Sequence, residues 1–463
     1  MKRAVWLGML ALAAGMTALP VRAESQDDEG EKKFTIHGEV RARWEYVDNI
    51  LDFEDSADRG GIGDPADDSF SFTPFRIRIA AKGMFAKGVT GYVELQNNGF
   101  FGDEFPQKVF DDPIGQAFDN TGFYNDDQND TNLYQGFLEL DHIGGSNFGA
   151  SIGRREHALG NELQMGDSDF YGGQSFDGVR GWYGNDKWNV NGFMYKVAEN
   201  NILLFTGTQA DVDLRGVTFN MKFGSDQNQE IEPYLIIFHD GAEFFIDHAD
   251  FITLGARYTK SNPDHNGADW NVELALQDGD VGSGPNPDSH SASLVEGWFG
   301  WSFGGKHRVH VGALMSSGDD DESDGVGGNE DTDHEDYLFL FPDNHAHNRL
   351  GDMDIVEGFL SYADTFFGSL FSNGITDYNV GYEWMGETNS FMAAYHQFTL
   401  TEPLFTGNDA LGSEIDLGFN HMYNENTSLG VFVGNFMADD VILDLFGTDD
   451  DAMRIWGQAR LRW

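Results

Sequence analysis

Apolar and polar residues alternate with a period of two along much of the chain. From Phe34 to Tyr46 the even positions are apolar or glycine, and the odd positions are polar or charged. Such a segment predicts a strand with one face in an apolar medium and the other in water. The pattern recurs near 75–79, 270–276, 309–315 and 415–419, and again from Arg454 to Trp463. A final strand that ends on an aromatic residue is typical of barrels assembled in a bacterial outer membrane.

Two kinds of β-protein contain such strands. The edge strands of a soluble β-sandwich also alternate. Segments of about 10 residues with aromatic ends, joined by alternating short and long connections, favour a transmembrane antiparallel β-barrel. We therefore predict an all-β fold with short periplasmic turns and long acidic extracellular loops.

The lengths of the connections set the number of strands. Short turns are expected near 86–88, 142–147, 184–187, 224–229, 304–305 and 423–427, and long connections at 48–71, 99–132, 156–173, 317–352, 400–411 and 439–452. Counting every alternating stretch gives nineteen strands, but a closed barrel with both termini on the periplasmic side needs an even number. The segment 352–372 is therefore assigned to a loop. Its apolar spacing (Ile355, Val356, Phe359, Leu360 and Ala363) predicts a short helix, and eighteen strands remain.

The first residues predict export. Lys2 and Arg3 precede an apolar stretch from Val5 to Leu19, and a small-residue cleavage site ends at Ala23. We divide the chain into a signal peptide (1–23), a polar leader (24–33) and a single barrel (34–463) whose long loop 317–372 contains the short helix. No later segment has 18 consecutive apolar residues, so a helical membrane span is not expected.

Composition excludes several classes of protein. The chain has no cysteine, which removes disulfide scaffolds, thiolate metal sites and cysteine nucleophiles. Its net charge of -50 argues against nucleic acid as a partner. No nucleophile motif, phosphate loop or zinc-binding helix is present, and carboxylate pairs such as Asp167 and Asp177 are unavoidable among 78 acids. We therefore expect no enzymatic activity.

Much of the negative charge lies in four long connections, 48–71, 99–132, 317–352 and 439–452. They hold 34 acids and only three cations: Arg59, Lys108 and Arg349. An acidic outer mouth would repel large polyanions and concentrate cations within a screening length of roughly 10 Å at moderate salt. Solubility in brine and divalent-cation binding are alternative explanations of the same acids.

One acidic loop resembles a calcium-binding loop. Asp320, Glu322, Asp324 and Asp331 stand at positions 1, 3, 5 and 12, with Gly325 at position 6. Position 3 is normally Asp or Asn, and no helices flank the segment, so a looser Ca²⁺ site on these loops is the competing interpretation. We treat these four acids as candidate Ca²⁺ ligands.

Most arginines fall on the water-facing phase of a strand. Strands 1, 2 and 18 become neighbours once the barrel closes, so seven arginines are predicted to share one inner wall: Arg41, Arg43, Arg76, Arg78, Arg454, Arg460 and Arg462. We call this set the arginine wall. Arginines in a lumen select for anions, because guanidinium groups match carboxylates bidentately. They also pair with lumen acids such as Glu39 and Glu45 to hold the shape of the barrel, and both roles remain open.

Several motifs resemble the alginate-export family of outer-membrane porins. They are Ile152-Gly153-Arg154-Arg155, Leu159-Gly160-Asn161-Glu162-Leu163, Gly166-Asp167, Ser175-Phe176-Asp177-Gly178-Val179-Arg180, Leu340-Phe341-Pro342-Asp343-Asn344-His345, Gly351-Asp352-Met353-Asp354 and Gly412-Ser413-Glu414-Ile415-Asp416-Leu417. The resemblance implies an eighteen-stranded barrel whose arginine-lined lumen passes an anionic polysaccharide in the best-known member. It adds Arg154, Asp167 and Asp177 to the candidate lumen residues, and one of its motifs ends at Arg180, which the alternation already places on the water-facing phase of a strand. Strict alternation would place Arg155 rather than Arg154 in the lumen. The very acidic loops depart from what an alginate exporter suggests.

Two functions follow. The first is an outer-membrane channel that passes anionic or sugar-like solutes, including an exopolysaccharide, through the arginine-lined lumen. The second is a structural or surface-interaction barrel whose acidic loops bind divalent cations. The expected partners are outer-membrane lipid, lipopolysaccharide and small or polymeric anionic solutes. A monomer is favoured, and export and import are not distinguished by a passive pore.

Overall fold

The fold was analysed in a computed structural model of the chain. It describes residues 34–50, 69–101, 131–167, 169–170, 172–200, 210–224, 226–241, 249–262, 265–282, 288–319, 333–343, 349–353, 355–356, 373–404 and 406–463. The predicted signal peptide and polar leader lie outside these residues, as do the candidate Ca²⁺ ligands Asp320, Glu322, Asp324 and Asp331.

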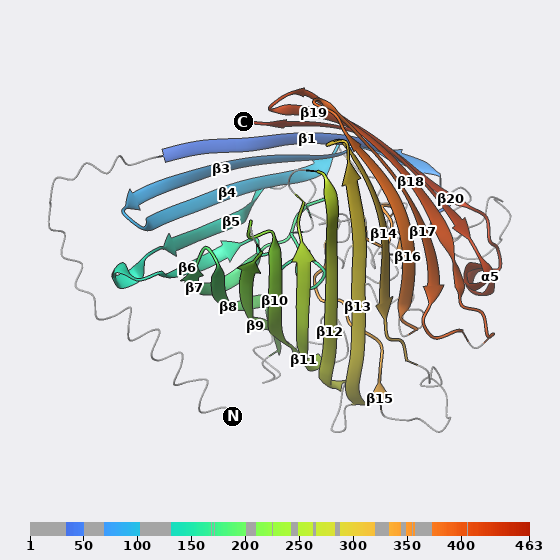
Figure 1. The fold of residues 1–463 in the computed structure, drawn as a ribbon, viewed down its shortest axis with the longest axis horizontal. Coiled ribbons are helices and arrows are strands. Elements are labelled where there is room, and N and C mark those ends of the chain that lie inside the picture. Colours follow the sequence, from blue (N-terminus) through green and yellow to red (C-terminus); the bar gives the residue numbers. More distant parts are fainter. Residues whose placement is uncertain are drawn as a thin grey trace.

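Eighteen long strands form one closed antiparallel barrel, which confirms the predicted fold class and strand number. The first and last strands, β1 and β20, pair from Glu39↔Arg462 to Asp48↔Met453 and lie side by side in Figure 1. The strands are β1 (Phe34–Asp48), β3 (Pro74–Ala86), β4 (Val89–Phe100), β5 (Thr131–Leu140), β6 (Phe148–Arg155), β7 (Phe176–Asn185), β8 (Trp188–Asn200), β9 (Ala210–Phe223), β10 (Gln229–Asp240), β11 (Ala249–Lys260), β12 (Gly267–Val281), β13 (Asp288–Phe303), β14 (His307–Ser316), β16 (Ile375–Met385), β17 (Asn389–Leu400), β18 (Ala410–Asn424), β19 (Thr427–Ala438) and β20 (Ala452–Arg462).

The connections alternate as predicted. Short turns join β3 to β4, β5 to β6 and β7 to β8, and continue in the same way to β18 and β19, so they mark the periplasmic end. Longer connections, beginning with the one between β1 and β3, mark the outer end. Two short strands lie in these outer connections. β2 (Phe70–Phe72) pairs with β1, and β15 (Asp333–His334) pairs in parallel with β13.

Helical structure is sparse in the described residues. A 3₁₀ turn, η1 (Ile143–Gly145), lies in the β5–β6 turn, and α5 (Asp440–Phe446) follows β19. The Asp439 side chain caps α5 at its N-terminus, and the helix buries Val441 and Ile442. Sequence analysis did not predict α5. Of the segment 352–372, in which a helix was predicted, Ile355 and Val356 are helical, residues 352–353 form a bend, and residues 354 and 357–372 lie outside the described residues. No helix in the described residues is long and apolar enough to cross a membrane.

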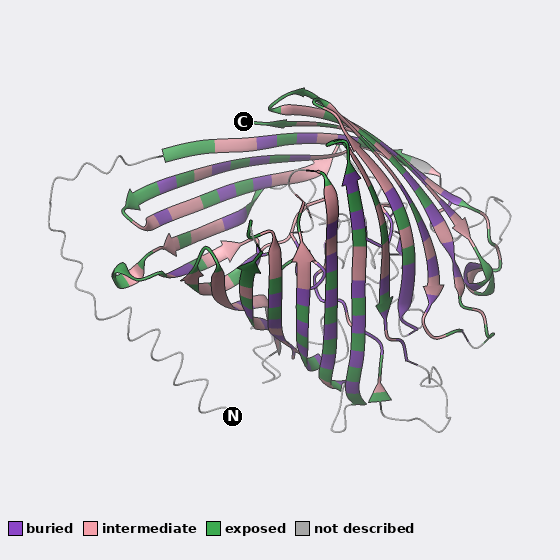
Figure 2. Cartoon of the chain, in the orientation of Figure 1, coloured by how far each residue is buried: buried purple, intermediate pink, exposed green. Residues whose placement is uncertain are grey.

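The outer face of the barrel carries the apolar phase of the alternation. Ile36, Ile79, Leu254, Leu276 and Val311 are each more than half exposed, and Figure 2 shows the resulting exposed bands across the strands. Exposure of so many large apolar side chains is unfavourable in water, because apolar surface in contact with water raises the free energy of the folded protein. It is favourable in hydrocarbon, so the band identifies an outer-membrane barrel.

Within the part of the chain that the structure describes, two outer connections fold back into the barrel. We call the described residues of 156–175 loop A and the described residues of 335–356 loop B. They pair with each other through a parallel bridge between Met165 and Phe341, where the Gly166 amide donates to the Phe341 carbonyl at 2.7 Å. The Asp343 amide likewise donates to the Glu162 carbonyl at 2.9 Å. The two loops therefore form one unit.

This unit packs on inward apolar side chains of the barrel, which sequence analysis did not predict. Phe341 of loop B lies 5.4 Å from Phe176 of β7 and 6.4 Å from Phe238 of β10, between ring centroids. Leu340 and Met165 are almost completely buried in the same cluster. We call this surface the apolar wall; its barrel residues are Phe176, Phe193, Tyr195, Val212, Leu214, Tyr234, Ile236, Phe238, Ala249, Phe251 and Val281.

Candidate functional site: the arginine wall and the inner loops

The arginine wall is built by the registers of three neighbouring strands. β1 pairs with β3 on one side and β20 on the other, so Arg41 stands opposite both Arg76 and Arg460. Directly opposed cations are unfavourable across a sheet unless acids separate them. The structure thus brings the seven predicted arginines onto one inner face, where they require carboxylate partners.

Glu39 and Glu45 of β1 supply part of that charge. Glu39 accepts hydrogen bonds from Arg76 at 2.6 Å, from Arg460 at 2.5 Å and from Arg462 at 3.1 Å. Glu45 accepts from Arg454 at 2.8 Å. These pairs, which are buried at Arg76 and Arg454, correspond to the structural role that sequence analysis left open, because each acid joins β1 to a neighbouring strand.

A third carboxylate, Asp169, reaches the wall from loop A. Its Oδ1 accepts from Arg76 at 2.7 Å and from Arg78 at 3.0 Å, and its Oδ2 accepts from Arg460 at 3.1 Å. Its carbonyl oxygen accepts from Arg41 at 2.7 Å. Burial alone would raise the pKa of Asp169, but Arg76, Arg78 and Arg41 hold that pKa well below its usual range. Asp169 is therefore an anion bound by the wall, supplied by the protein itself.

The next residue, Phe170, covers other members of the wall. The Arg43 guanidinium carbon lies 3.7 Å from the Phe170 ring centroid, and that of Arg454 lies at 5.1 Å. Stacked guanidinium groups gain from the ring quadrupole, most strongly where water is excluded. Sequence analysis missed both Asp169 and Phe170. The nearby Gly166-Asp167 motif was the only signal, and it did not single out either residue.

Three acids meet where loops A and B join. Carboxylate oxygens of Glu162, Asp167 and Asp343 lie within 4.8 Å of one another. Burial, followed by the neighbouring carboxylates of Glu162 and Asp169, raises the pKa of Asp167 to about 7, and burial also raises the pKa of Glu162. The arrangement is suited to holding a shared proton, and oxygen ligands of this kind also bind divalent cations. Asp167 thus faces the lumen, next to the wall rather than in it.

Other contacts fix loop B to the barrel through the residues of the sequence motifs. Glu414 of β18 accepts hydrogen bonds from the amides of Asp352 at 2.8 Å and Met353 at 3.0 Å. Arg349 donates to Glu296 of β13 at 2.6 Å and to the Asn161 carbonyl of loop A at 2.9 Å. Motifs far apart in the sequence therefore meet inside the barrel.

Arg154 and Asp177 do not lie where they were expected. They form an ion pair of 2.5 Å on the outward phase, next to the exposed Ile152 and Val179. Arg155 points inward, where it contacts Ser151 at 2.8 Å and Glu139 at 3.4 Å. Strict alternation through β6 holds to its end, so the alternation predicted Arg155 correctly and the motif-based placement of Arg154 and Asp177 in the lumen is corrected.

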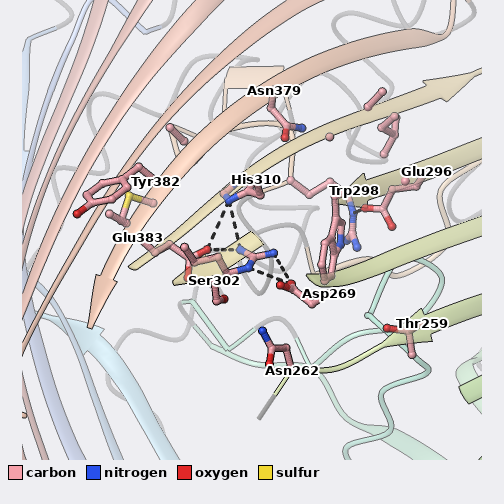
Figure 3. Close-up of a pocket in the computed structure, with 18 of the residues that line it drawn as sticks. Thr259, Asn262, Asp269, Glu296, Trp298, Ser302, His310, Asn379, Tyr382 and Glu383 are labelled. Carbon is pink, nitrogen blue, oxygen red and sulfur yellow. Dashed lines mark hydrogen bonds and ion pairs between the residues drawn. The ribbon is translucent and has the colours of Figure 1, made fainter. Parts of the chain in front are cut away.

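Two further arginines, the predicted Arg180 and also Arg308, face the lumen away from the wall. Arg180 donates to Asn191 at 3.1 Å. Arg308 of β14 pairs with Asp269 at 2.8 Å and with Glu383. It lines a cavity of about 570 Å³ that runs from the periplasmic turns up to loop B. Figure 3 shows Asp269, Glu383 and His310 converging there, with Trp298 at one side.

Residues 53–357 match the model of a family described as alginate export. The chain belongs to the alginate export family. The match covers both inner loops and every quoted sequence motif except the one at 412–417, and it confirms the family that those motifs predicted. A search of curated proteins finds no match.

Solved porins share the fold at low sequence identity. OccK11 (OpdR) of Pseudomonas aeruginosa has a TM-score of 0.54 and 11% identity over 92% of this chain and 96% of its own. A BenF-like porin of Pseudomonas fluorescens Pf-5 has a TM-score of 0.56 and 11% identity over 93% and 99%. Pseudomonas aeruginosa OpdK, solved with vanillate, has a TM-score of 0.54 and 11% identity over 92% and 99%. This chain is thus a porin-like outer-membrane barrel of the alginate export family.

Proposed function

We propose that this barrel is a passive channel for carboxylate-bearing solutes, small or polymeric, with the arginine wall as its selective element. The observation that carries the proposal is the environment of Asp169. Its carboxylate, which lies on loop A rather than on a strand, is bound by Arg76, Arg78 and Arg460 together. A wall that binds this carboxylate has the donors to bind that of a solute.

Asp169 then acts as a competitor of the solute. When loop A occupies the wall, the single carboxylate of Asp169 occupies hydrogen-bond donors of three arginines and balances one of their positive charges. A solute carboxylate that exchanges with Asp169 replaces one anion by another, so the exchange leaves no buried cation uncompensated. A solute without an anionic group lacks this compensation, so it cannot replace Asp169 without leaving arginine charge unbalanced.

Two further points support testing carboxylates first. The family is named for export of alginate, an anionic polysaccharide, and a barrel of the same fold has been solved with vanillate, itself a carboxylate. Neither fact assigns a solute to this chain. The direction of transport follows from the concentration gradient.

Reconstitution in a planar bilayer tests the proposal. We expect discrete conductance steps and, in a KCl gradient, a reversal potential on the anion side. Added carboxylate solutes should reduce the chloride current, and equimolar neutral sugar should not. A reversal potential on the cation side would show that the channel does not select for anions.

A structural or surface-interaction barrel is the second candidate function. The observation that favours it is the packing of loops A and B on the apolar wall, since a tightly packed insert closes a lumen. Absence of conductance at every salt concentration, from protein shown to be folded by its heat-dependent gel mobility, would favour this function over a channel. Binding of Ca²⁺ by the acidic outer loops belongs to the same proposal, and calorimetric titration with CaCl₂ tests it.

A further inference from the structure

Two histidines join the short outer strand β15 to the barrel. β15 pairs in parallel with β13, so His334 stands beside His290. His290 Nδ1 lies 3.0 Å from His334 Nδ1, and the ring centroids are 5.1 Å apart. Two ring nitrogens at this distance form a hydrogen bond only if one of them carries a proton and the other does not. We call these two residues the histidine pair.

The other ring nitrogen of His290 has a fixed role. The Gln277 amide donates from Nε2 to the Leu338 carbonyl at 2.8 Å, and its Oε1 accepts from the Leu338 amide at 2.9 Å. These two backbone contacts determine which end of the Gln277 amide is oxygen. His290 Nε2 lies 3.1 Å from that oxygen, which can only accept, so His290 Nε2 carries a proton.

The other ring nitrogen of His334 faces a carboxylate. His334 Nε2 lies 2.8 Å from Oδ1 of Asp336, which is buried. An ionised carboxylate only accepts hydrogen bonds, so His334 Nε2 also carries a proton. The four ring nitrogens therefore hold three protons, whichever Nδ1 is the donor. Two neutral imidazoles hold two, so the histidine pair carries one positive charge.

Carboxylates near the histidine pair balance this charge. They are Asp278 of β12, Asp288 of β13, Asp319 after β14, and Asp333 and Asp336 on the same connection as His334. The neighbour from β11 is the uncharged ring of Phe251, whose centroid lies 5.1 Å from that of His290. Burial alone would lower the pKa of His334, but Asp336, followed by Asp319 and Asp288, raises that pKa above its ordinary value.

The histidine pair also holds the beginning of loop B. Gln277, which accepts from His290, binds both backbone groups of Leu338, just before Leu340 and Phe341 reach the apolar wall. Loss of the shared proton would leave two nitrogen lone pairs facing each other and the nearby carboxylates without their counter-charge. Both changes are unfavourable in a buried place, so they would weaken the contact of β15 with β13 and of Leu338 with Gln277.

We propose that the histidine pair is a proton-dependent latch, which holds β15 and the beginning of loop B against β12 and β13 at neutral pH and releases them in alkaline medium. The charged pair is the form that holds. Its stabilisation is therefore complete below the ordinary pKa of histidine, about 6.5, and is lost as the pH rises through the raised pKa of His334. The latch lies at the outer end of the barrel, so it responds to the external medium, and it does not depend on the solute proposed for the arginine wall.

Hydrogen exchange of the full-length protein in detergent tests the latch. Protection of residues 333–338 is measured from pH 6 to 10 with EDTA present and is corrected for intrinsic rates. We expect it to fall with rising pH, by up to about tenfold per pH unit between the ordinary and the raised pKa, while protection of residues 294–300 of β13 stays constant. Protection of 333–338 that does not change with pH would overturn the proposal, and so would an equal fall in 294–300.

Three variants assign the titration, each after heat-modifiable mobility has confirmed folding. His334→Gln keeps a hydrogen-bonding side chain but cannot be charged, so protection of 333–338 should be lower at pH 6 and independent of pH. Asp336→Asn removes a carboxylate that favours the charged pair, so the fall should begin at lower pH. His239→Gln, at an outward and partly exposed histidine of β10, is the matched control and should keep the wild-type slope. A slope that persists in His334→Gln, an unshifted fall in Asp336→Asn, or loss of the slope in His239→Gln would contradict the latch.

Discussion

The arginine wall and the apolar wall hold the same two loops by different forces. At the arginine wall, Asp169 and Phe170 of loop A meet guanidinium groups, so the contact depends on charge and is weakened by salt. At the apolar wall, Leu340 and Phe341 of loop B are buried by aromatic and aliphatic side chains, and salt does not weaken that contact. We therefore expect the two walls to have different roles. The apolar wall would keep the loops inside the barrel, and the arginine wall would exchange one carboxylate for another.

The largest effect is expected from breaking the apolar contact. Leu340→Ala with Phe341→Ala removes two buried side chains, at a cost of about 2–5 kcal/mol each. Loops A and B should then leave the lumen, and the single-channel conductance should rise several-fold. Leu429→Ala, which truncates an exposed outward residue of β19, is the control. Unchanged conductance in the double variant would show that these contacts do not retain the loops.

The next effect comes from the charged contact. Asp169→Asn removes the anion that pairs with Arg76, Arg78 and Arg460 but leaves the apolar contacts in place. The anion-to-cation permeability ratio should increase, with a smaller change in conductance than in the apolar variant. Reversal potentials in a KCl gradient measure this ratio. Asp177→Asn, on the outward face, should not alter it, and an equal change in both variants would exclude a specific role of Asp169.

These expectations rest on placements that differ in how far the sequence revealed them. Alternation predicted that Arg41 and Arg43 lie on the inner face of β1, and barrel closure predicted that they lie beside Arg76 and Arg460. These two predictions depend only on strand period and strand order. Asp169 could not be found in this way, since loop A is irregular and has no period.

The apolar wall, in contrast, is visible in the sequence. The continuous apolar run from Tyr234 to Phe238 indicates a strand buried on both faces. Sequence analysis did not use this run, because it assumed that the inner face of every strand contacts water.

Protonation should distinguish the loop junction from both walls. Because the pKa of Asp167 is raised to about 7, the folded junction holds a proton that the unfolded loop would already have lost above about pH 4. The stability from this proton is complete below about pH 4, falls steadily as the pH rises to about 7, and then stays constant. Hydrogen exchange of residues 159–167 between pH 4 and 8, corrected for intrinsic rates, measures this loss.

The matched variants for this prediction differ in one carboxylate. Asp167→Asn should make protection independent of pH across that range. Asp250→Asn, an outward acid of β11, should retain the slope of the wild type. A slope that persists in Asp167→Asn would assign the titration to another group of the cluster.

The smallest expected effect concerns the aromatic cover of the wall. Phe170→Leu keeps an apolar side chain but removes the ring that stacks on Arg43, a loss of about 1 kcal/mol, or roughly fivefold in protection. Hydrogen exchange of loop A residues near 170 should show this change, while protection of residues 338–341 at the apolar wall should not. A similar loss at both places would mean that the two contacts are not independent.

The reversal potential of one combined variant tests the central claim most directly. Arg76, Arg78, Arg460 and Arg462 are replaced by alanine together, and the variant is compared with the wild type in the same KCl gradient after heat-modifiable mobility has confirmed folding. If the arginine wall selects the solute, the reversal potential shifts towards the cation side. An unchanged reversal potential would contradict the account and would assign these arginines to holding the shape of the barrel.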